Sequence, residues 1–388
     1  MFTIKTLNAI SPIIHEELDP SLFTVSAEAE NPDAILVRSF KMHDMPIPEK
    51  LLSVVRAGAG YNNIPVDRMT EQGVAVFNTP GANANAVKEL AVCALLLASR
   101  DVVGGIEWAL SLKGQGDEVA ALVEKGKGQF VGPELAGKTL GVLGLGAVGV
   151  KIANVATHLR MKVHGFDPYL SVENAWALSR AIVKAPSQDA LIAAADYLTI
   201  HVPYNADTKH MVNAGFLSKM KKGAVLLNLS RNELADNEAV KAALASGQLR
   251  KYVVDFPTED LLGVPGVICI PHLGASTPES EENCAQMAAA QTRDYLLYGS
   301  IRNSVNLPNC ELSAPEAHRV AVIHRNVPNM ISQITAQMAA EGVNISHMVN
   351  RSRQAVAYTV LDLDSPASES ALAQLAKIDG ILRVRVIR

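Results

Sequence analysis

Three side chains suited to carboxylate binding and proton transfer are spaced along the second half of the chain. Arg231 follows the predicted strand 226–230, and His272 follows the predicted strand 267–271. The carboxyl ends of parallel strands meet at one edge of a sheet, where ligands bind in open α/β folds. We therefore expect both side chains at that edge, where an arginine can grip a carboxylate with two hydrogen bonds and a histidine can accept a hydroxyl proton.

The third side chain, Glu259, lies on the loop that precedes the strand of His272. A carboxylate on the far ring nitrogen would fix the imidazole tautomer and stabilise its protonated form. Singly, each residue has an ordinary alternative: a surface ion pair for Arg231, or a hydrogen-bonded loop histidine for His272. As an ordered set, they predict oxidation of a hydroxy acid, which needs a cation, a base and a group that tunes the base.

A glycine-rich segment at 139–149 supplies the expected cofactor site. It reads TLGVLGLGAVG, with an apolar run before the first turn glycine and apolar residues at helical spacing after the last. Gly144 would allow the tight turn, Gly146 would let the backbone approach a pyrophosphate, and Gly149 would let the helix pack on the strand. The unpaired N–H groups of the helix would face the anion. This pattern predicts a dinucleotide-binding turn over a merely structural one.

A second predicted strand, 162–166, ends at Asp167. At this distance from the turn, a carboxylate can accept hydrogen bonds from the adenosine ribose. It would repel a 2′-phosphate, so the sequence favours NAD over NADP.

Strand and helix patterns continue to alternate up to His272, which predicts a doubly wound parallel sheet of the Rossmann type. The further strands are expected at 197–202, 224–229, 252–255 and 267–270. Short apolar segments and turn signals from Met1 to about Leu95 predict a smaller α/β domain. A helix is expected at 278–297 and a linker at 308–315.

The last seventy or so residues predict a separate βαββαβ unit with a ferredoxin-like order. Its strands are expected at 318–324, 344–350, 355–363 and 382–387, and its helices at 330–341 and 369–378. The unit has no obvious acid–base cluster, so we expect a regulatory or assembling role, with simple structural extension as the alternative.

The bulk properties exclude several classes of protein. The 388 residues suffice for two or three domains, and a formal charge of −4 gives no basic footprint for nucleic acid. The uncharged stretch 90–99 is too short to cross a bilayer, and the N-terminus lacks a secretion signal. The four cysteines have no metal-ligand or disulfide spacing. These features predict a cytoplasmic protein with no metal, no membrane partner and no nucleic-acid partner.

Taken together, the motifs resemble the D-isomer-specific 2-hydroxyacid dehydrogenases, in particular the members that end in an ACT domain. The resemblance covers essentially the whole chain. The segments that carry it are 56–63 (RAGAGYNN), 78–83 (NTPGAN), 144–149 (GLGAVG), 230–231 (SR), 256–259 (FPTE) and 271–277 (PHLGAST).

The resemblance implies NAD-dependent oxidation of 3-phospho-D-glycerate to 3-phosphohydroxypyruvate, the first step of serine biosynthesis. It also implies a Rossmann domain (96–284) inserted in a smaller flavodoxin-like substrate domain (1–95 and 285–308). A linker (309–316) and an ACT regulatory domain (317–388) would follow. A homodimer or homotetramer would be formed, with L-serine as a possible effector.

Site residues are implied in the same way. Arg231, Glu259 and His272 would be the catalytic residues. The cofactor would be bound by Gly144, Gly146, Ala147, Val148, Gly149, Asp167, His201, Pro203, Ser230 and Asp255. The substrate carboxylate and phosphate would be bound by Arg38, Ser39, Arg56, Asn83 and Lys127, and the effector by His324, Asn326 and Asn344.

The chain departs from the family pattern at three places. Ala-Arg-Gly-Gly becomes Ser230-Arg231-Asn232-Glu233, the loop from Asp255 to Glu259 is one residue short, and Pro-Gly becomes Pro328-Asn329. Asparagine tolerates positive φ, so the last turn can survive. Three alternatives stay open: a dehydrogenase for another D-2-hydroxy acid such as glycerate or 2-hydroxyglutarate, an NADH-sensing regulator without catalysis, and an amino-acid-binding module. The last explains only the C-terminal unit.

Overall fold

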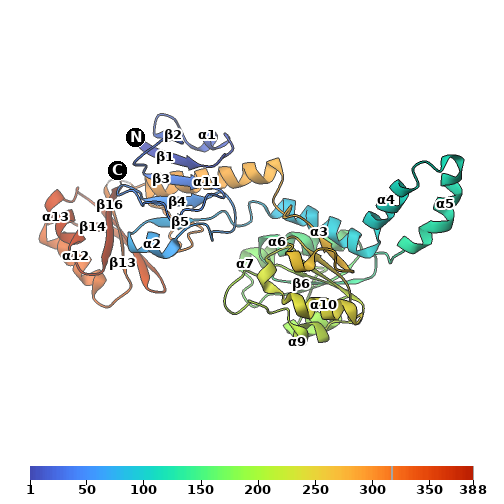
Figure 1. Cartoon of the computed structure of the whole chain (residues 1–388). Helices are drawn as coiled ribbons and strands as arrows, with labels where there is room; N and C mark the ends of the chain where they lie inside the picture. The colour runs from blue at the N-terminus through green and yellow to red at the C-terminus, as the bar shows by residue number, and fades with distance from the viewer. Residues whose placement is uncertain (316–317, 388) are drawn as a thin grey trace. The chain divides into compact units, whose positions relative to one another are not determined.

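A computed structural model of the chain describes residues 1–315 and 318–387. It divides into two compact units, the first made of Met1–Ala82 with Glu281–Arg388 and the second of Asn83–Ser280 (Figure 1). The domain boundaries given above stay a prediction. The end of the predicted linker, the first residue of the predicted ACT domain and the last residue of the chain lie outside the described residues.

The first unit contains a five-stranded parallel sheet in the order β2-β1-β3-β4-β5, which is the flavodoxin-like order. Its strands are β1 (Phe2–Leu7), β2 (Phe23–Ser26), β3 (Ala34–Val37), β4 (Ser53–Arg56) and β5 (Ala75–Phe77). The four residues of β3 are all buried, as expected for a parallel strand covered on both faces. Helices α11 (Pro278–Tyr298) and α1 (Ile14–Glu17) pack in the core on one face, and α2 (Val66–Glu71) packs on the other.

The second unit holds a seven-stranded parallel sheet in the order β12-β11-β10-β9-β6-β7-β8, which confirms the doubly wound fold. Its strands are β6 (Thr139–Leu143), β7 (Lys162–Phe166), β8 (Val183–Lys184), β9 (Tyr197–Ile200), β10 (Ala224–Asn228), β11 (Leu249–Val254) and β12 (Val267–Cys269). The strand order reverses between β6 and β9. The carboxyl ends of these two strands therefore form the topological switch point, where ligands bind in such folds.

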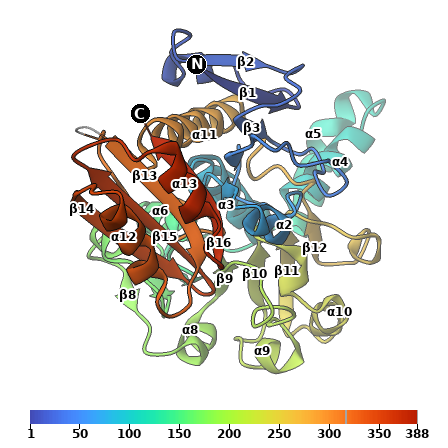
Figure 2. The ribbon, with the colours of Figure 1, turned by 90° about the vertical axis from the view of Figure 1, so that its left-hand side faces the viewer.

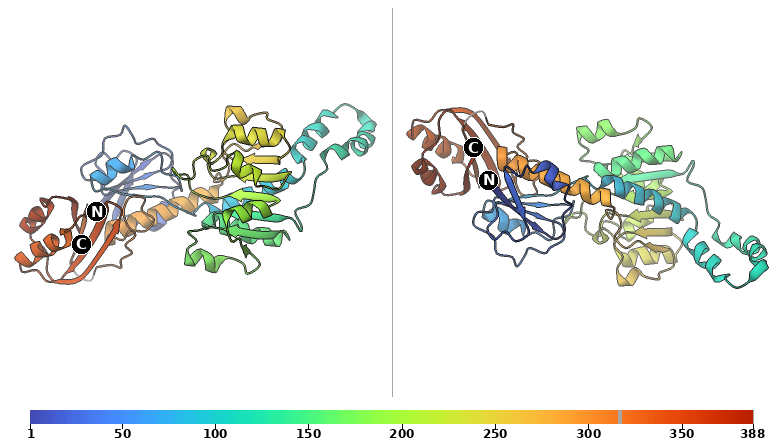
Figure 3. Two further views of the ribbon diagram at one scale, coloured as in Figure 1. Left: turned by 90° about the horizontal axis from the view of Figure 1, so that it is seen from below. Right: turned by 90° about the horizontal axis from the view of Figure 1, so that it is seen from above.

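Helices cover both faces of this sheet. On one face, α3 (Ala84–Ser99) and α6 (Ala147–His158) pack over β6 and β10. On the other face lie α8 (Gln188–Ala194), α9 (Ala214–Ser218) and α10 (Asn237–Ala245), while α7 (Val172–Ala177) contacts α6. The hairpin of α4 (Val102–Ser111) and α5 (Val119–Gly126) stands out from the sheet (Figure 3), and neither helix has a buried residue. The short helices η1 (Gly116–Glu118) and η2 (Lys127–Phe130) complete this hairpin.

The C-terminal part of the first unit has the predicted βαββαβ order and forms an antiparallel sheet, β14-β15-β13-β16. Its elements are β13 (His318–Arg325), α12 (Met330–Ala340), β14 (Ile345–Arg353), β15 (Val356–Leu363), α13 (Glu369–Ala376) and β16 (Ile381–Ile387). Both helices cover one face of the sheet (Figure 2). The ACT-like architecture expected from the sequence is confirmed.

The other face of this antiparallel sheet shares a core with the five-stranded sheet. Tyr358 and Ile387 pack with Phe77, Tyr295 and Ile301 in one buried cluster. The Tyr358 hydroxyl donates to the Gly299 carbonyl at 2.8 Å. The ACT-like part is therefore packed against the N-terminal sheet as well as joined to it through the chain.

None of the described helices combines the length and apolar character needed to cross a lipid bilayer. Across residues 1–315 and 318–387, no three His, Cys, Asp or Glu side chains gather as a metal site would require. The cysteines are free thiols: Cys93 is exposed, Cys269 is half-buried, and Cys284 and Cys310 are buried.

Candidate active site

The glycine turn connects β6 to α6 at the switch point of the seven-stranded sheet. Gly144 has φ +90°, a conformation open to glycine and strained for other residues. A Cβ on Gly149 would overlap the Gly144 carbonyl oxygen, whereas a Cβ on Gly146 would meet nothing within 4 Å. The turn and helix are thus packed tightly, with open space at the glycine where the backbone would approach a pyrophosphate. Ala147 and Val148 begin the helix whose N–H groups face that space. These residues fit a dinucleotide.

Asp167, directly after β7, binds back onto the turn. One carboxylate oxygen accepts from the Leu145 N–H at 2.8 Å and the other accepts from the Tyr169 N–H at 2.8 Å. The side chain therefore fixes the turn. Each oxygen has a further lone pair for the expected ribose hydroxyls.

His201 follows β9 on the other side of the switch point. Its Nε2 lies 2.8 Å from the Thr199 hydroxyl, and burial lowers the pKa of the ring to about 4. The imidazole is consequently neutral at pH 7. Ser230, at the end of β10, donates its hydroxyl to the Ile200 carbonyl at 2.7 Å, and Pro203 lies exposed two residues beyond His201.

Arg231 and His272 both contact Phe256 at the carboxyl edge of the sheet. The rings of Phe256 and His272 are 4.3 Å apart, and the Arg231 guanidinium lies 5.3 Å from the Phe256 ring centre. Arg231 also donates to the Ser230 carbonyl at 2.7 Å. The two side chains predicted to handle the carboxylate and the proton are thus gathered around one aromatic ring, a role for Phe256 that the sequence reasoning missed.

The backbone of His272 has φ +54°, an uncommon conformation for a residue other than glycine. Such strain concentrates at functional sites when the surroundings hold it in place. Asp255 supplies that hold, because its carboxylate accepts from the N–H groups of Leu273 and Gly274 at 2.8 and 2.9 Å. Burial raises the pKa of Asp255, against the opposing effect of these two bonds. In this structure Asp255 fixes the histidine loop.

Glu259 begins the short helix η4 (Glu259–Leu261) and is exposed. In the part of the chain that the structure describes, no hydrogen bond or ion pair joins it to His272. Beside Arg231, η3 (Asn232–Leu234) carries the departure from the family pattern. The side-chain oxygen of Asn232 is buried and has no hydrogen-bond partner among the described residues, and Glu233 is exposed.

A basic pocket of about 430 Å³ lies in the first unit, at the carboxyl ends of β3 and β4. Three of the predicted substrate residues line it, together with four polar or basic residues that the sequence reasoning did not select. The lining residues are Arg38, Ser39, Lys41, His43, Arg56, Asn62 and Asn63. Lys41 and His43 follow Arg38 on the loop after β3, and Asn62 and Asn63 follow Arg56 on the loop after β4, so the signal for the missed residues was their closeness in sequence to the two selected arginines.

Two contacts shape this pocket. The Arg38 guanidinium pairs with Glu281 at 2.5 Å, and the Arg56 Nε donates to the Arg38 carbonyl at 3.0 Å. The other predicted substrate residues belong to the second compact unit: Asn83 precedes α3, and Lys127, in η2, pairs with Glu124 on the exposed hairpin.

The predicted effector residues are split between opposite ends of the antiparallel sheet. His324 is 2% exposed, and its nitrogens lie 2.8 Å from the Arg325 carbonyl and from the Thr359 hydroxyl. The exposed Asn326 side chain donates to the Gln354 carbonyl beside it. Asn344 instead lines a pocket of about 440 Å³ between α12 and the start of β14. Within one chain, the three do not form one site.

Comparisons with known proteins agree with this geometry. Residues 106–274 match the model of the D-isomer specific 2-hydroxyacid dehydrogenase, NAD binding domain. The D-3-phosphoglycerate dehydrogenase of Escherichia coli K12 is 32% identical over 352 residues, 87% of this chain and 82% of that protein. Its namesake from Haemophilus influenzae is 30% identical over 355 residues, with the same shares covered.

Solved structures show the same fold. The NAD⁺-bound 3-phosphoglycerate dehydrogenase of Entamoeba histolytica has a TM-score of 0.61 and 24% identity, covering 79% of this chain and 98% of that one. The chain belongs to the D-isomer-specific 2-hydroxyacid dehydrogenase family and is an NAD-dependent enzyme of that family.

Proposed function

We propose that the chain oxidises 3-phospho-D-glycerate to 3-phosphohydroxypyruvate, the first step of serine biosynthesis. The observation that carries this substrate is the basic pocket of the first unit, where Arg38, Lys41, His43 and Arg56 converge. Several cations in one pocket suit a doubly charged phosphate. The names of the bacterial relatives support the same substrate.

The chemistry rests on the residues around Phe256. NAD, when bound, supplies the hydride acceptor. The Arg231 guanidinium would hold the substrate carboxylate and polarise the C2 oxygen, while His272 would accept the proton of the C2 hydroxyl. Glu259 would stabilise the protonated imidazole after a movement of its exposed side chain. Of the predicted cofactor residues, the three turn glycines and the start of α6 would hold the pyrophosphate, and Asp167 the ribose.

The test compares NADH formation from 3-phospho-D-glycerate and from unphosphorylated D-glycerate at alkaline pH. A strong preference for the phosphorylated acid is the expected result. Equal rates, or a preference for D-glycerate or 2-hydroxyglutarate, would assign the enzyme to another D-2-hydroxy acid. NADH binding without turnover on any of these acids would favour the sensor, an alternative supported by the altered residues Asn232 and Glu233.

We further propose that L-serine binds the ACT-like part across two chains. His324 pairs with Ala357 on β15 and Ile345 pairs with Leu363, six residues further along. At the rise of a strand, this separation is roughly 20 Å. Asn344 of one chain could therefore join His324 and Asn326 of another only in an assembly that brings opposite sheet ends together.

The serine proposal has a direct measurement. Millimolar L-serine should lower the rate of NADH formation and raise the unfolding temperature, since a ligand at 100 times its Kd stabilises by about 2.7 kcal/mol. If neither the rate nor the stability changes, the proposal is wrong.

A homodimer or homotetramer is part of the same proposal. The edge strand β14 is largely exposed, and α4 exposes Val103, Ile106 and Leu110 along one side. Apolar surface of this kind is commonly covered in oligomers. Sedimentation of the full chain tests this, and a monomer at micromolar concentration would refute it. A cytoplasmic location stays a prediction from the sequence.

A further inference from the structure

A second basic crevice lies in the first unit, at the end of β14. It has a volume of about 560 Å³ and is formed by the antiparallel sheet, two segments of the N-terminal domain and the connection after α11. The lining residues are Tyr61, Asn78, Pro80, Asn303, Ser304, Val305, Pro308, Asn309, Arg351, Ser352 and Arg353. It shares no lining residue with the pocket of Arg38 and Arg56.

Two guanidinium groups enter this crevice from alternate positions of β14. Arg351 pairs with Tyr358 and Arg353 with Val356, and both partners belong to the core shared with the N-terminal sheet. Because side chains alternate along a strand, both arginines project from that same face. The chain carries a net charge of −4, yet none of the described residues that line the crevice is acidic.

Most of the hydrogen-bonding groups that the arginines and Asn309 present to the crevice are donors. Arg353 donates once, from Nη1 to the Ser304 carbonyl at 2.7 Å. For Arg351, no hydrogen bond or ion pair occurs within the described part of the chain. The Asn309 side-chain oxygen accepts from the Asn303 N–H, so its amide nitrogen is left to donate. A site with two cations and an excess of donors recognises an anion.

We propose that this crevice binds a small anion that carries a phosphate group. Two guanidiniums can each grip a phosphate with paired hydrogen bonds, and the volume is within the range of small-molecule sites. Free phosphate and a phosphate ester of a few carbons share this chemistry. The test below distinguishes them.

The position of the crevice gives binding a structural consequence. Residues 78–80 come just before Ala82, where the chain leaves the first compact unit. The side chain of Gln291, on α11, donates to the Asn78 carbonyl at 3.2 Å. An anion held by Arg351 and Arg353 would tie the edge strand β14 to this segment.

Hydrogen–deuterium exchange of the full chain locates the binding without using turnover. Inorganic phosphate at saturating concentration should slow exchange in peptides that cover 303–309 and 348–353. The protection should be lost in Arg351→Gln/Arg353→Gln and kept in Lys377→Gln, a matched loss of charge on the helical side of the antiparallel sheet. The Kd of the double variant for phosphate at the crevice should be at least about tenfold higher than that of the unaltered chain.

Several outcomes would overturn the proposal: no protection in the unaltered chain, protection that persists in the double variant, or an equal loss in Lys377→Gln. Should the double variant fail to fold, Arg351→Gln alone is decisive, because this guanidinium makes no described bond. At equal, subsaturating concentrations, stronger protection by 3-phosphoglycerate than by phosphate would identify an ester as the ligand, and equal protection would identify the phosphate group alone. Either result supports the site, and neither depends on the dehydrogenase activity.

Discussion

Two histidines in different parts of the molecule lie in opposite environments. His272 lies exposed at the edge of the seven-stranded sheet, with a left-handed backbone and its ring against Phe256. His324 lies buried in the antiparallel sheet, with both ring nitrogens within 2.8 Å of hydrogen-bonding partners. The first has hydrogen-bonding capacity left for a ligand, whereas the second would have to exchange a bond within the chain, such as that to Thr359, before it could bind serine.

Two arginines repeat the contrast. Arg231 gives one hydrogen bond to its neighbour and presents the rest of its guanidinium beside Phe256. Arg319 is 3% exposed and donates to both carboxylate oxygens of Asp362 and to the carbonyls of Tyr298 and Ser313. The number of hydrogen-bonding groups that a side chain leaves available therefore separates the binding residues from the structural ones better than residue type does.

The largest effect is expected from His272→Gln. Loss of a general base typically costs 10²- to 10⁴-fold, so kcat for NADH formation should fall by about that factor, while NADH binding and the unfolding midpoint hardly change. Steady-state kinetics and fluorescence titration of NADH measure the two effects. His158→Gln, at the exposed end of α6, is the matched control. Near-normal turnover in His272→Gln would remove His272 from the mechanism.

The converse effect is expected from Arg319→Met. Removing one partner of a buried pair leaves the other charge uncompensated, which costs about 3–5 kcal/mol of unfolding free energy. Urea unfolding should show this loss, while kcat of the folded enzyme stays within a factor of two or so. Arg325→Met, exposed at the end of the same strand, should change neither. A loss of kcat with no loss of stability would reverse the assignment of Arg319 to structure.

The sequence predicted the secondary-structure elements and the positions of the chemical residues along them better than the side-chain contacts within the site. The glycine turn, the positions of Arg231 and His272 after their strands, and the βαββαβ order follow from local periodicity and turn residues, which a single chain displays directly. Other features arise from packing between segments far apart in sequence. These are the contact of Phe256 with the His272 ring, the pairing of Arg38 with Glu281 and the burial of His324. No local pattern encodes such contacts. The hairpin of α4 and α5 was missed because its apolar residues have no core of their own to face.

His201 sharpens the comparison, since it lies at the cofactor edge yet is held neutral by burial. Its pKa is lowered to about 4, against about 6.5 in the unfolded chain. Between these values the unfolded state binds more protons, so stability rises with pH through this window and is lost as pH falls through it. The loss should reach up to about 3 kcal/mol at pH 4.

Urea unfolding at pH 7 and pH 4 measures this loss in the unaltered chain and in His201→Gln. The substitution removes the titrating ring, so the pH dependence should become shallower by that amount. His158→Gln, which removes an exposed histidine, is the matched control for the loss of an imidazole. If His201→Gln and the unaltered chain lose the same stability on acidification, the ring is charged without cost in the folded state.

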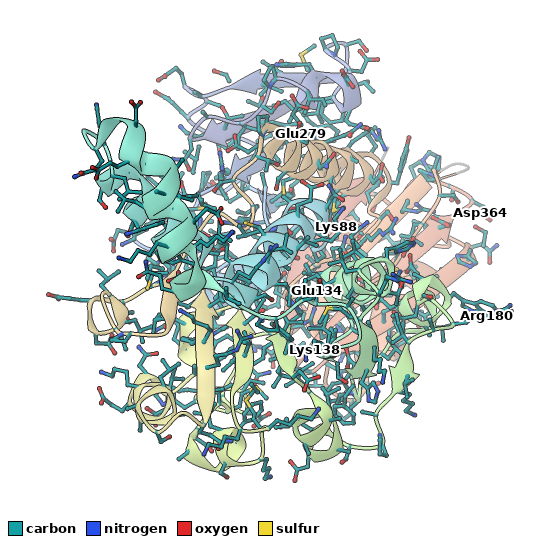
Figure 4. All side chains as sticks on the ribbon, turned by 90° about the vertical axis from the view of Figure 1, so that its right-hand side faces the viewer. Lys88, Glu134, Lys138, Arg180, Glu279 and Asp364 are labelled. Atoms are coloured by element: carbon teal, nitrogen blue, oxygen red, sulfur yellow. The ribbon has the colours of Figure 1, made fainter. Side chains whose placement is uncertain are left out.

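The smallest effect, and an improvement, is expected from Glu281→Gln. The Arg38 guanidinium forms an ion pair with Glu281, and the two side chains are 39% and 45% exposed. Such pairs contribute at most about 1 kcal/mol, so releasing the guanidinium should lower the KM for 3-phosphoglycerate about twofold to fivefold with little change in stability. The matched control is Glu282→Gln, one residue further along α11, whose first turn also carries Glu279 (Figure 4). Both substitutions remove one negative charge from the same helix end, so a general charge effect would lower KM equally in the two variants. A fall in KM confined to Glu281→Gln would show that Arg38 binds the substrate. An unchanged or raised KM would show that Arg38, like Arg319, has a structural role.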